Sequence, residues 1–157
     1  MVPVVLRIAV PGDEDELIPM MLDFNVSESI TLDPAVLRRA LSQLLADQSL
    51  GLVWFIETGP AADTAGYLVV TFGFDLEFGG RDAFLTELFV QPEARGCGAG
   101  AAALAIMEEQ VRVLGAGAVH LMVRPENEPA VRLYARTGFI EPPRRLLSKR
   151  LSPIADP

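Results

Sequence analysis

The segment from residue 83 to residue 114 constrains the fold of this chain more than any other. An apolar run ends at Val90 and meets a proline and a glycine-rich turn, after which Ala101 to Leu114 has the periodicity of an amphipathic helix. The predicted local structure is therefore strand, loop and helix in direct succession. Alone, the glycines would indicate only a flexible turn, but their place between a strand and a helix favours a binding loop.

The loop itself has the composition of a phosphate-binding turn. Its glycines place no side chains between the backbone and a ligand, so that successive N–H groups and the positive end of the helix dipole can converge on an anion. Arg95 adds a positive charge beside them. We expect anion-binding positions at Arg95, Gly96, Cys97, Gly98, Ala99, Gly100 and Ala101.

A dinucleotide-binding fold is the first alternative for this loop. Residues 96–101 also fit the form G-x-G-x-x-A, which requires an acidic residue about 20 positions further on, at the end of the next strand. The next predicted strand, Ala118 to Val123, ends in Arg124 and Pro125 instead. Only residues 101–157 remain for the further strand and helix units that such a fold needs, so we reject this interpretation.

The length of 157 residues and the hydrophobic share of 50% indicate one domain over residues 1–157 that can bury a hydrophobic core. No apolar run approaches the roughly 20 residues that span a bilayer, and the start of the chain lacks a secretory pattern, so we expect no membrane association. Cys97 is the only cysteine, which excludes an internal disulfide and suits the cytoplasm. With one histidine besides, the chain has little from which to build a zinc site, and no metal is predicted.

The charge of the chain is unevenly distributed. The net charge of −8 argues against nucleic acid as a partner. Residues 1–80 hold 12 acidic and three basic residues, a net charge of −9, whereas residues 81–157 hold nine acidic and 10 basic residues, a net charge of +1. The first half should attract cations and the second can accept a phosphorylated cofactor. A merely solubilising acidic surface explains the same numbers.

Hydrophobic periodicity predicts the remaining elements. Strands are expected at Val4 to Val10, Leu50 to Glu57, Ala65 to Thr71 with a continuation to Phe74, and Phe84 to Val90, with one or two more after Phe139. Helices are expected after the acidic cluster at residues 13–16, after the cap Asp33-Pro34, after the glycine-rich loop, and after Asn127-Glu128-Pro129. The acidic cluster has a complete explanation as a first helical turn, and we assign it no catalytic role.

Arg95, Gly98 and Gly100 match the motif R/Q-x-x-G-x-G/A, and the loop therefore resembles the acetyl-CoA pyrophosphate loop of the GNAT superfamily of N-acetyltransferases. The segment from Asn127 to Tyr134, with Gly138-Phe139, is similar to the second signature of that family. The resemblance implies an α/β (α+β) fold with a mixed, largely antiparallel sheet of six to seven strands and about four helices. It also implies acetyl-CoA as cofactor and direct transfer of the acetyl group to an amine.

Glu87 is the candidate general base. Strand alternation puts it on one side with Leu85 and Phe89, a lone carboxylate among apolar neighbours. Burial would raise its pKa toward the range useful for a base near neutral pH. A structural ion pair with an arginine explains the same residue equally well. Its place on the strand that leads to the cofactor loop favours catalysis.

The resemblance assigns further roles by position. Tyr134 matches the tyrosine that often protonates the CoA sulfur, although it also fits an amphipathic core position. A backbone N–H near Phe89 or Val90 would orient and polarise the thioester carbonyl. Asn127 would contact the pantetheine arm, cap its helix, or do both.

The acceptor is predicted to be a small cationic amine. Residues 78–84 and the sequence Glu-Leu-Phe-Val from Glu87 look similar to the polyamine and small-amine branch, and the acidic first half agrees with this substrate class. Glu28, Asp75 and Glu87 are the predicted acceptor ligands, with Asp23 and Glu77 as further candidates, although each loop acid also fits a solvated surface. A protein N-terminus, a lysine side chain, or a non-catalytic acyl-CoA-binding regulatory module are the alternatives. Because dimers are common in the resembled family, the resemblance implies a homodimer as one expectation.

Overall fold

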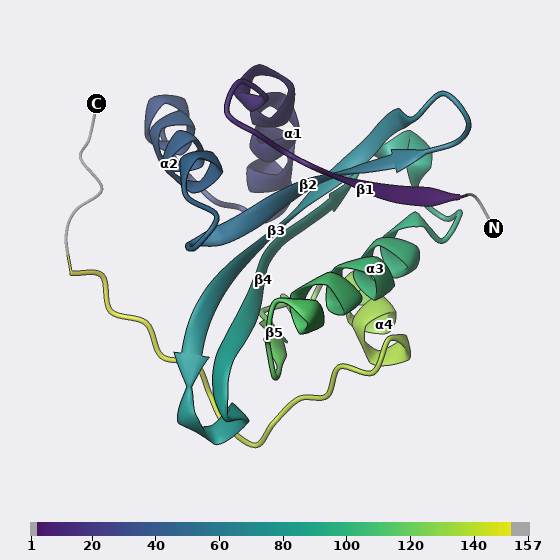
Figure 1. The fold of residues 1–157 in the computed structure, drawn as a ribbon. Coiled ribbons are helices and arrows are strands. Elements are labelled where there is room, and N and C mark those ends of the chain that lie inside the picture. Colours follow the sequence, from purple (N-terminus) through teal and green to yellow (C-terminus); the bar gives the residue numbers. More distant parts are fainter. Residues whose placement is uncertain (1–2, 152–157) are drawn as a thin grey trace.

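The computed structural model describes residues 3–151 and shows one twisted sheet with helices on both faces (Figure 1). The mixed α/β class is therefore as predicted. In chain order the elements are β1 (Val4–Ile8), α1 (Glu14–Ser27), α2 (Pro34–Ala46), β2 (Gly51–Thr58), β3 (Asp63–Asp75), β4 (Gly80–Val90), α3 (Ala99–Val113), β5 (Val119–Leu121) and α4 (Glu128–Arg136), with short 3₁₀ turns at Leu76–Phe78 and Pro92–Ala94.

The strands follow one another across the sheet in the order β1-β2-β3-β4-β5. The first four are antiparallel neighbours, and only β5 runs parallel to its neighbour β4. That parallel pairing is short: it joins Ala83, Phe84 and Leu85 to the three residues of β5. Beyond Leu85, β4 has no partner on its β5 side within the described residues.

Two hydrophobic layers enclose the sheet. Alternation along β2 and β3 sends Phe55, Tyr67 and Val69 toward α1 and α2, and Trp54, Leu68 and Val70 toward α3. α1 and α2 therefore cover one face, while α3 and α4 lie on the other (Figure 1). α2 begins as predicted, because the Asp33 side chain accepts a hydrogen bond from the N–H of Ala35 at 2.6 Å.

The prediction of six to seven strands is wrong for the described residues, which form five. The missing strands were expected after Phe139, but Phe139 to Leu151 has no helix or strand, and residues 152–157 lie outside the described part. Pro142 and Pro143 interrupt this segment and cannot donate the N–H groups that a sheet ladder requires. We call residues 139–151 the C-terminal arm.

The predicted faces of β4 are wrong at one point, because a β-bulge lies at Thr86. Glu87 pairs with Val69 but Leu85 pairs with Val70, so that Thr86 is an extra residue in β4. Leu85 consequently packs in the layer under α3, whereas Phe89 packs in the layer under α1. Glu87 is thus on the face of Phe89 but not, as strict alternation predicted, on that of Leu85.

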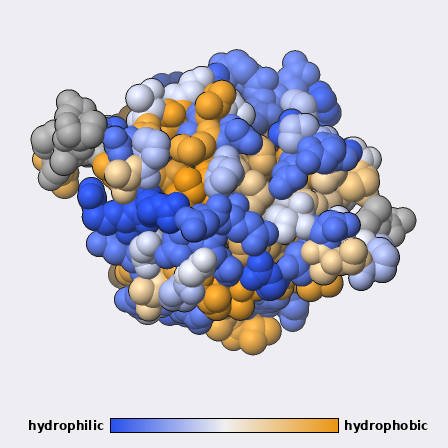
Figure 2. Space-filling model, turned by 90° about the horizontal axis from the view of Figure 1, so that it is seen from above, coloured by the Kyte–Doolittle hydropathy of each residue, from blue (hydrophilic) through white to orange (hydrophobic). Residues whose placement is uncertain are grey.

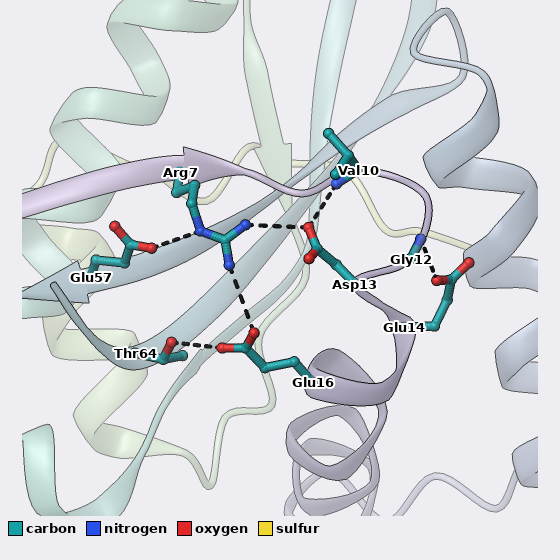
Figure 3. A network of polar contacts seen from close by, with 8 residues as sticks. All are labelled: Arg7, Val10, Gly12, Asp13, Glu14, Glu16, Glu57 and Thr64. Atoms are coloured by element: carbon teal, nitrogen blue, oxygen red, sulfur yellow. Dashed lines mark hydrogen bonds and ion pairs between the residues drawn. The ribbon is translucent and has the colours of Figure 1, made fainter.

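The acidic cluster at the start of α1 serves an ionic network around Arg7 (Figure 3). The Arg7 guanidinium, which lies 4.1 Å from the centroid of the Phe55 ring, contacts Glu57 at 2.7 Å, Asp13 at 3.2 Å and Glu16 at 3.7 Å. Glu57 belongs to β2, Asp13 precedes α1 and Glu16 lies in its first turn, so these contacts join β1 to both β2 and α1. Asp13 and Glu16 of the acidic cluster therefore stabilise the packing of these elements.

From the side of α1 and α2 the surface is mostly hydrophilic, with apolar side chains in separate groups (Figure 2). Among residues 3–151, no helix is long and apolar enough to cross a membrane. The most exposed large apolar side chains include three in the C-terminal arm, at Ile140, Leu147 and Leu151, which are between 86% and 89% exposed.

Candidate active site

The divergence of β4 and β5 opens the sheet beside the glycine-rich loop. The N–H of Gln91 donates to the carbonyl of Ala65 at 2.8 Å, which fixes the ladder at this end of β4. In an antiparallel ladder successive residues turn their backbone groups to opposite sides, so the groups of Phe89 point to β3 and those of Leu88 and Val90 point toward the gap. Of the two N–H groups considered from sequence, Val90 is therefore the one that faces the opening.

The loop presents free backbone donors to this opening. Gly96 and Gly98 have φ angles of +78° and +87°, a left-handed conformation that favours glycine. Gly98 is the N-cap of α3, and its carbonyl accepts the N–H of Ala102 at 3.0 Å. The N–H groups of the residues between them, 99–101, precede that first helical hydrogen bond and have no acceptor within the helix. They lie at the positive end of the helix dipole, which suits an anion.

The side chains of Arg95 and Cys97 stabilise the loop by hydrogen bonds to backbone carbonyls nearby. The Arg95 Nε donates to the carbonyl of Val90 at 2.8 Å, and its guanidinium lies 5.7 Å from the centroid of the Phe89 ring. The Cys97 thiol donates to the carbonyl of Ala94 at 3.0 Å. Both side chains are exposed, so Arg95 contributes an accessible positive charge at the loop, whereas Cys97 stabilises its turn.

Asn127 both caps α4 and reaches across the opening. Its side-chain oxygen accepts the N–H of Ala130 at 3.3 Å, and its Nδ2 donates to Glu28 at 3.3 Å. Glu28 is the C-cap of α1, 99 positions away in sequence. The capping function predicted for Asn127 is therefore present, and the same side chain joins the end of α1 to the start of α4.

These elements surround one cavity of about 1020 Å³. Its walls come from the end of α1, the end of β4, the loop with the first turn of α3, and α4 with the segment before it. Of the residues predicted from sequence, the cavity brings together Glu28, Phe89, Val90, Arg95, Gly96, Gly98, Ala99, Gly100, Ala101, Asn127 and Tyr134.

Two cavity arginines were not predicted. Arg124 and Arg136 line the cavity together with Arg95, so three basic residues lie in its wall beside the acidic residues Glu28 and Glu126. Arg124 contacts Ser29 at 3.4 Å and Glu126 at 3.8 Å. The signal available in the sequence was the net charge of +1 in residues 81–157, which indicated an anion site without naming these residues.

Tyr134 stands on α4 with its ring at the cavity wall. The ring packs edge-on against Phe139 at a centroid distance of 5.7 Å. Burial, with the negative charge of Glu28 as a smaller cause, raises the pKa of the Tyr134 hydroxyl to about 12. At neutral pH the hydroxyl is therefore protonated and can act as a proton donor.

Glu87 lies behind the cavity wall rather than in it. Its Oε2 accepts a hydrogen bond from the Tyr67 hydroxyl at 2.6 Å. Burial raises the pKa of the Glu87 carboxyl, and the hydrogen bond from Tyr67 opposes part of that rise. The alternative of a structural ion pair with an arginine is not found: within residues 3–151, Glu87 forms no ion pair.

Asp75, Glu77 and Asp23 do not line the cavity. Asp75 ends β3 at the far end of the β3–β4 hairpin, where its side chain caps the turn by accepting the N–H of Glu77 at 2.8 Å. Glu77 bonds to Arg144 of the C-terminal arm at 2.5 Å. Asp23 is exposed on α1. The predicted acceptor acids therefore do not lie together. Glu28 is the one that lines the cavity, whereas Asp75 and Glu77 lie at the end of the hairpin.

Comparison with known proteins agrees with this geometry. The sequence profile of the Acetyltransferase (GNAT) family matches residues 19–139. The integron cassette protein HFX_CASS3, from the mobile metagenome of Cole Harbour Salt Marsh, is 35% identical, with a TM-score of 0.81 over 94% of this chain and 91% of that one. A protein of Arthrobacter sp. FB24 with a provisional acetyltransferase name is 31% identical, with a TM-score of 0.74 over 94% and 95% of the two chains.

A third structure shows the same fold with its cofactor. A predicted acetyltransferase of Clostridium acetobutylicum, solved with acetyl-CoA, is 18% identical, with a TM-score of 0.76 over 94% and 96% of the two chains. No curated protein matches the chain significantly in sequence. The family match covers both the glycine-rich loop and the Asn127–Tyr134 segment. The chain therefore belongs to the GNAT family and is an acetyl-CoA-dependent N-acetyltransferase.

Proposed function

We propose that this enzyme acetylates the primary amine of a small, cationic acceptor. The observation that carries the proposal is the position of Glu28, a carboxylate at the cavity wall that is bonded to Asn127 and lies close enough to Tyr134 to influence its hydroxyl. A fixed carboxylate at this place complements a second ammonium group of the acceptor. The net charge of −9 over residues 1–80 supports the attraction of a cation to this side.

The residues around the cavity fit acetyl-CoA. Its pyrophosphate requires several donors at one place, and the N–H groups of Ala99, Gly100 and Ala101 provide them at the start of α3. The guanidinium groups of Arg95, Arg124 and Arg136 supply further positive charge for the phosphates. When bound, the cofactor supplies an acetyl thioester whose carbonyl carbon is open to attack by an amine.

The chain then has to polarise the carbonyl and manage two protons. The Val90 N–H, which faces the gap between β4 and β5, is the proposed donor to the carbonyl oxygen. When the amine nitrogen displaces the sulfur from the carbonyl carbon of the thioester, the Tyr134 hydroxyl would give its proton to that sulfur. Glu87 takes the proton from the attacking nitrogen through water. Asp75 has no part in this proposal, because it lies at the far end of β3.

The first prediction concerns the acceptor class. In a thiol-release assay with acetyl-CoA, diamines and polyamines are expected to give higher kcat/KM values than neutral monoamines of similar length, because only they carry a second positive charge for Glu28. Saturating acetyl-CoA should also raise the unfolding temperature of the protein. Activity confined to neutral or acidic acceptors would contradict the proposed substrate class, and equal transfer to peptide N-termini or lysine would favour a protein acceptor.

The variant Glu28→Gln sharpens this test. It keeps a side-chain oxygen for the hydrogen bond from Asn127 but removes the charge, so KM for diamines should rise roughly 10-fold, the size of a partly exposed ionic contact of about 1.4 kcal/mol, while neutral monoamines respond little. Asp75→Asn is the matched control, because it neutralises an acid outside the cavity. A thermal shift by acetyl-CoA without turnover of any amine would favour the non-catalytic binding module.

The proposal includes a homodimer in the cytoplasm. The free Cys97 suits a reducing compartment. The C-terminal arm supports a second copy as partner, because it exposes large apolar side chains and carries four basic residues and one acidic residue, whereas residues 1–80 carry the net charge of −9.

The second prediction tests this association. The full chain should sediment as a dimer in analytical ultracentrifugation, and the double variant Leu146→Asp with Leu147→Asp should sediment as a monomer, since it places charges where the arm would be buried. Val5→Asp, which changes an exposed apolar residue on the edge strand β1, outside the arm, should leave the dimer intact. A monomeric parent protein at tens of micromolar would reject the dimer without affecting the proposed reaction.

A further inference from the structure

Tyr67 is a fully buried tyrosine whose hydroxyl forms a hydrogen bond with one other described residue. It lies in β3, opposite Phe89 of β4, and its side chain is 0% exposed. Its ring contacts Phe24 of α1 edge-on at 6.5 Å and Phe89 at 5.9 Å between centroids. Phe24 and Phe89 both line the cavity, so Tyr67 lies directly behind an aromatic part of its wall.

The Tyr67 hydroxyl holds one of the two carboxylate oxygens of Glu87. The distance of 2.6 Å between the hydroxyl and Oε2 is that of a strong hydrogen bond to an ionised acceptor. The burial of Tyr67 raises the pKa of its phenol far above the usual range, so the phenol is always the donor. Because both flanking aromatic rings restrict the phenol, the carboxylate is fixed in one orientation.

The second oxygen of Glu87 has a different environment. Within residues 3–151, Oε1 accepts no hydrogen bond. Among the described side chains, Asn25 Nδ2 is the one polar atom that is both fully buried and without a hydrogen-bond partner. Since Glu87 Oε1 also has no partner, it is not fully buried. Water can therefore reach Oε1, while Oε2 is held by the protein.

We propose that Tyr67 is a positioning residue for the base, which fixes Oε2 of Glu87 and leaves Oε1 as the atom that receives the amine proton from water. This inference rests on the proposed function. Removal of the phenolic hydroxyl would free the carboxylate to rotate and would withdraw the hydrogen bond that favours its charged form. The protein then ionises Glu87 only at higher pH, and the pH dependence of catalysis moves with it.

The other titratable groups near Tyr67 and Glu87 do not hold the Glu87 carboxylate as the phenol does. On α1, Asp23 acts on the phenol of Tyr67 by its charge. On the β5 side, His120 and Asp82 contact each other at 3.2 Å; Asp82 precedes Glu87 by five residues in β4, and His120 pairs with Phe84. Apart from the phenol itself, burial is the influence on the pKa of the Glu87 carboxyl.

The test compares the parent protein with Tyr67→Phe, which keeps the ring. Carbon-13 NMR of the Glu87 carboxyl carbon, in protein without acetyl-CoA, should show a pKa higher by roughly one unit, the effect expected of one lost hydrogen bond to a charged group. The acidic limb of the kcat/KM profile should move upward by the same amount. Thr86→Val, which removes the neighbouring hydroxyl bonded to the Val69 carbonyl, should leave both values unchanged.

A second variant, in which the donor at position 67 is strengthened instead of removed, tests the inference even if Tyr67→Phe misfolds. Incorporation of 3-fluorotyrosine at position 67 keeps the fold and strengthens the donor, so both the NMR pKa and the acidic limb should move to lower pH. An unchanged NMR pKa in both variants overturns the inference. A shifted NMR pKa with an unmoved limb also overturns it, because Glu87 would then not be the base, although acetyl transfer by the parent enzyme would still stand.

Discussion

Replacement of Tyr134 by Phe should lower kcat roughly 10²- to 10⁴-fold, the usual contribution of a positioned general acid. Only the hydroxyl is lost, so the ring still packs against Phe139 and still lines the cavity. Cofactor affinity should therefore change little. The large effect arises because the departing sulfur then loses the proton that the Tyr134 hydroxyl would give it, and a thiolate is a poorer leaving group than a thiol at neutral pH.

Stopped-assay measurement of kcat and calorimetric measurement of acetyl-CoA affinity separate these two effects. The pKa of about 12 for Tyr134 adds a pH criterion: the parent profile should show no descending limb from this tyrosine up to about pH 10, because the group is protonated throughout. Phe139→Leu is the matched control, since it disturbs the packing of the ring but leaves the hydroxyl. A kcat for Tyr134→Phe within threefold of the parent value would contradict the role as acid.

Local sequence patterns predicted the part of the site that local structure builds. The glycine-rich loop had to follow a strand and open a helix, and positive φ angles at Gly96 and Gly98 are conformations that glycine adopts without strain. Asn127 likewise caps a helix by a contact three residues away. Because each feature depends on neighbours in sequence, the spacing of residues sufficed to place it.

Contacts between distant segments were not predictable in the same way. The bulge at Thr86 shifts the face of every later residue in β4, and no residue in the strand itself signals an extra position. Tyr67 meets Glu87 only through the register of β3 with β4, and Glu28 meets Asn127 only because α1 ends beside α4. The missing strands after Phe139 are a different case, because Pro142 and Pro143 are local signals against a sheet ladder and stand in the sequence itself.

The glycine-rich loop offers the second large effect. Gly98→Asp should weaken acetyl-CoA binding by roughly 100-fold beyond any effect of Gly98→Asn, because a carboxylate about 6 Å from a phosphate costs about 2.8 kcal/mol at an effective dielectric constant of 20. Asn and Asp have nearly the same shape, and both tolerate the left-handed backbone that Gly98 adopts. An added Cβ at Gly98 meets no atom within 4 Å, so neither variant should clash within the protein.

The ratio of the two dissociation constants, measured by calorimetry at low ionic strength, therefore isolates charge from shape. Added salt should reduce the ratio, since the loop is exposed and its interactions are screened over about 10 Å at 0.1 M. Dephospho-CoA, which lacks the 3′-phosphate but keeps the pyrophosphate, should give a similar ratio if the loop holds the pyrophosphate. Equal affinities for the Asp and Asn variants would mean that no phosphate lies at the start of α3, and would contradict the proposed binding of the pyrophosphate by the N–H groups of Ala99, Gly100 and Ala101.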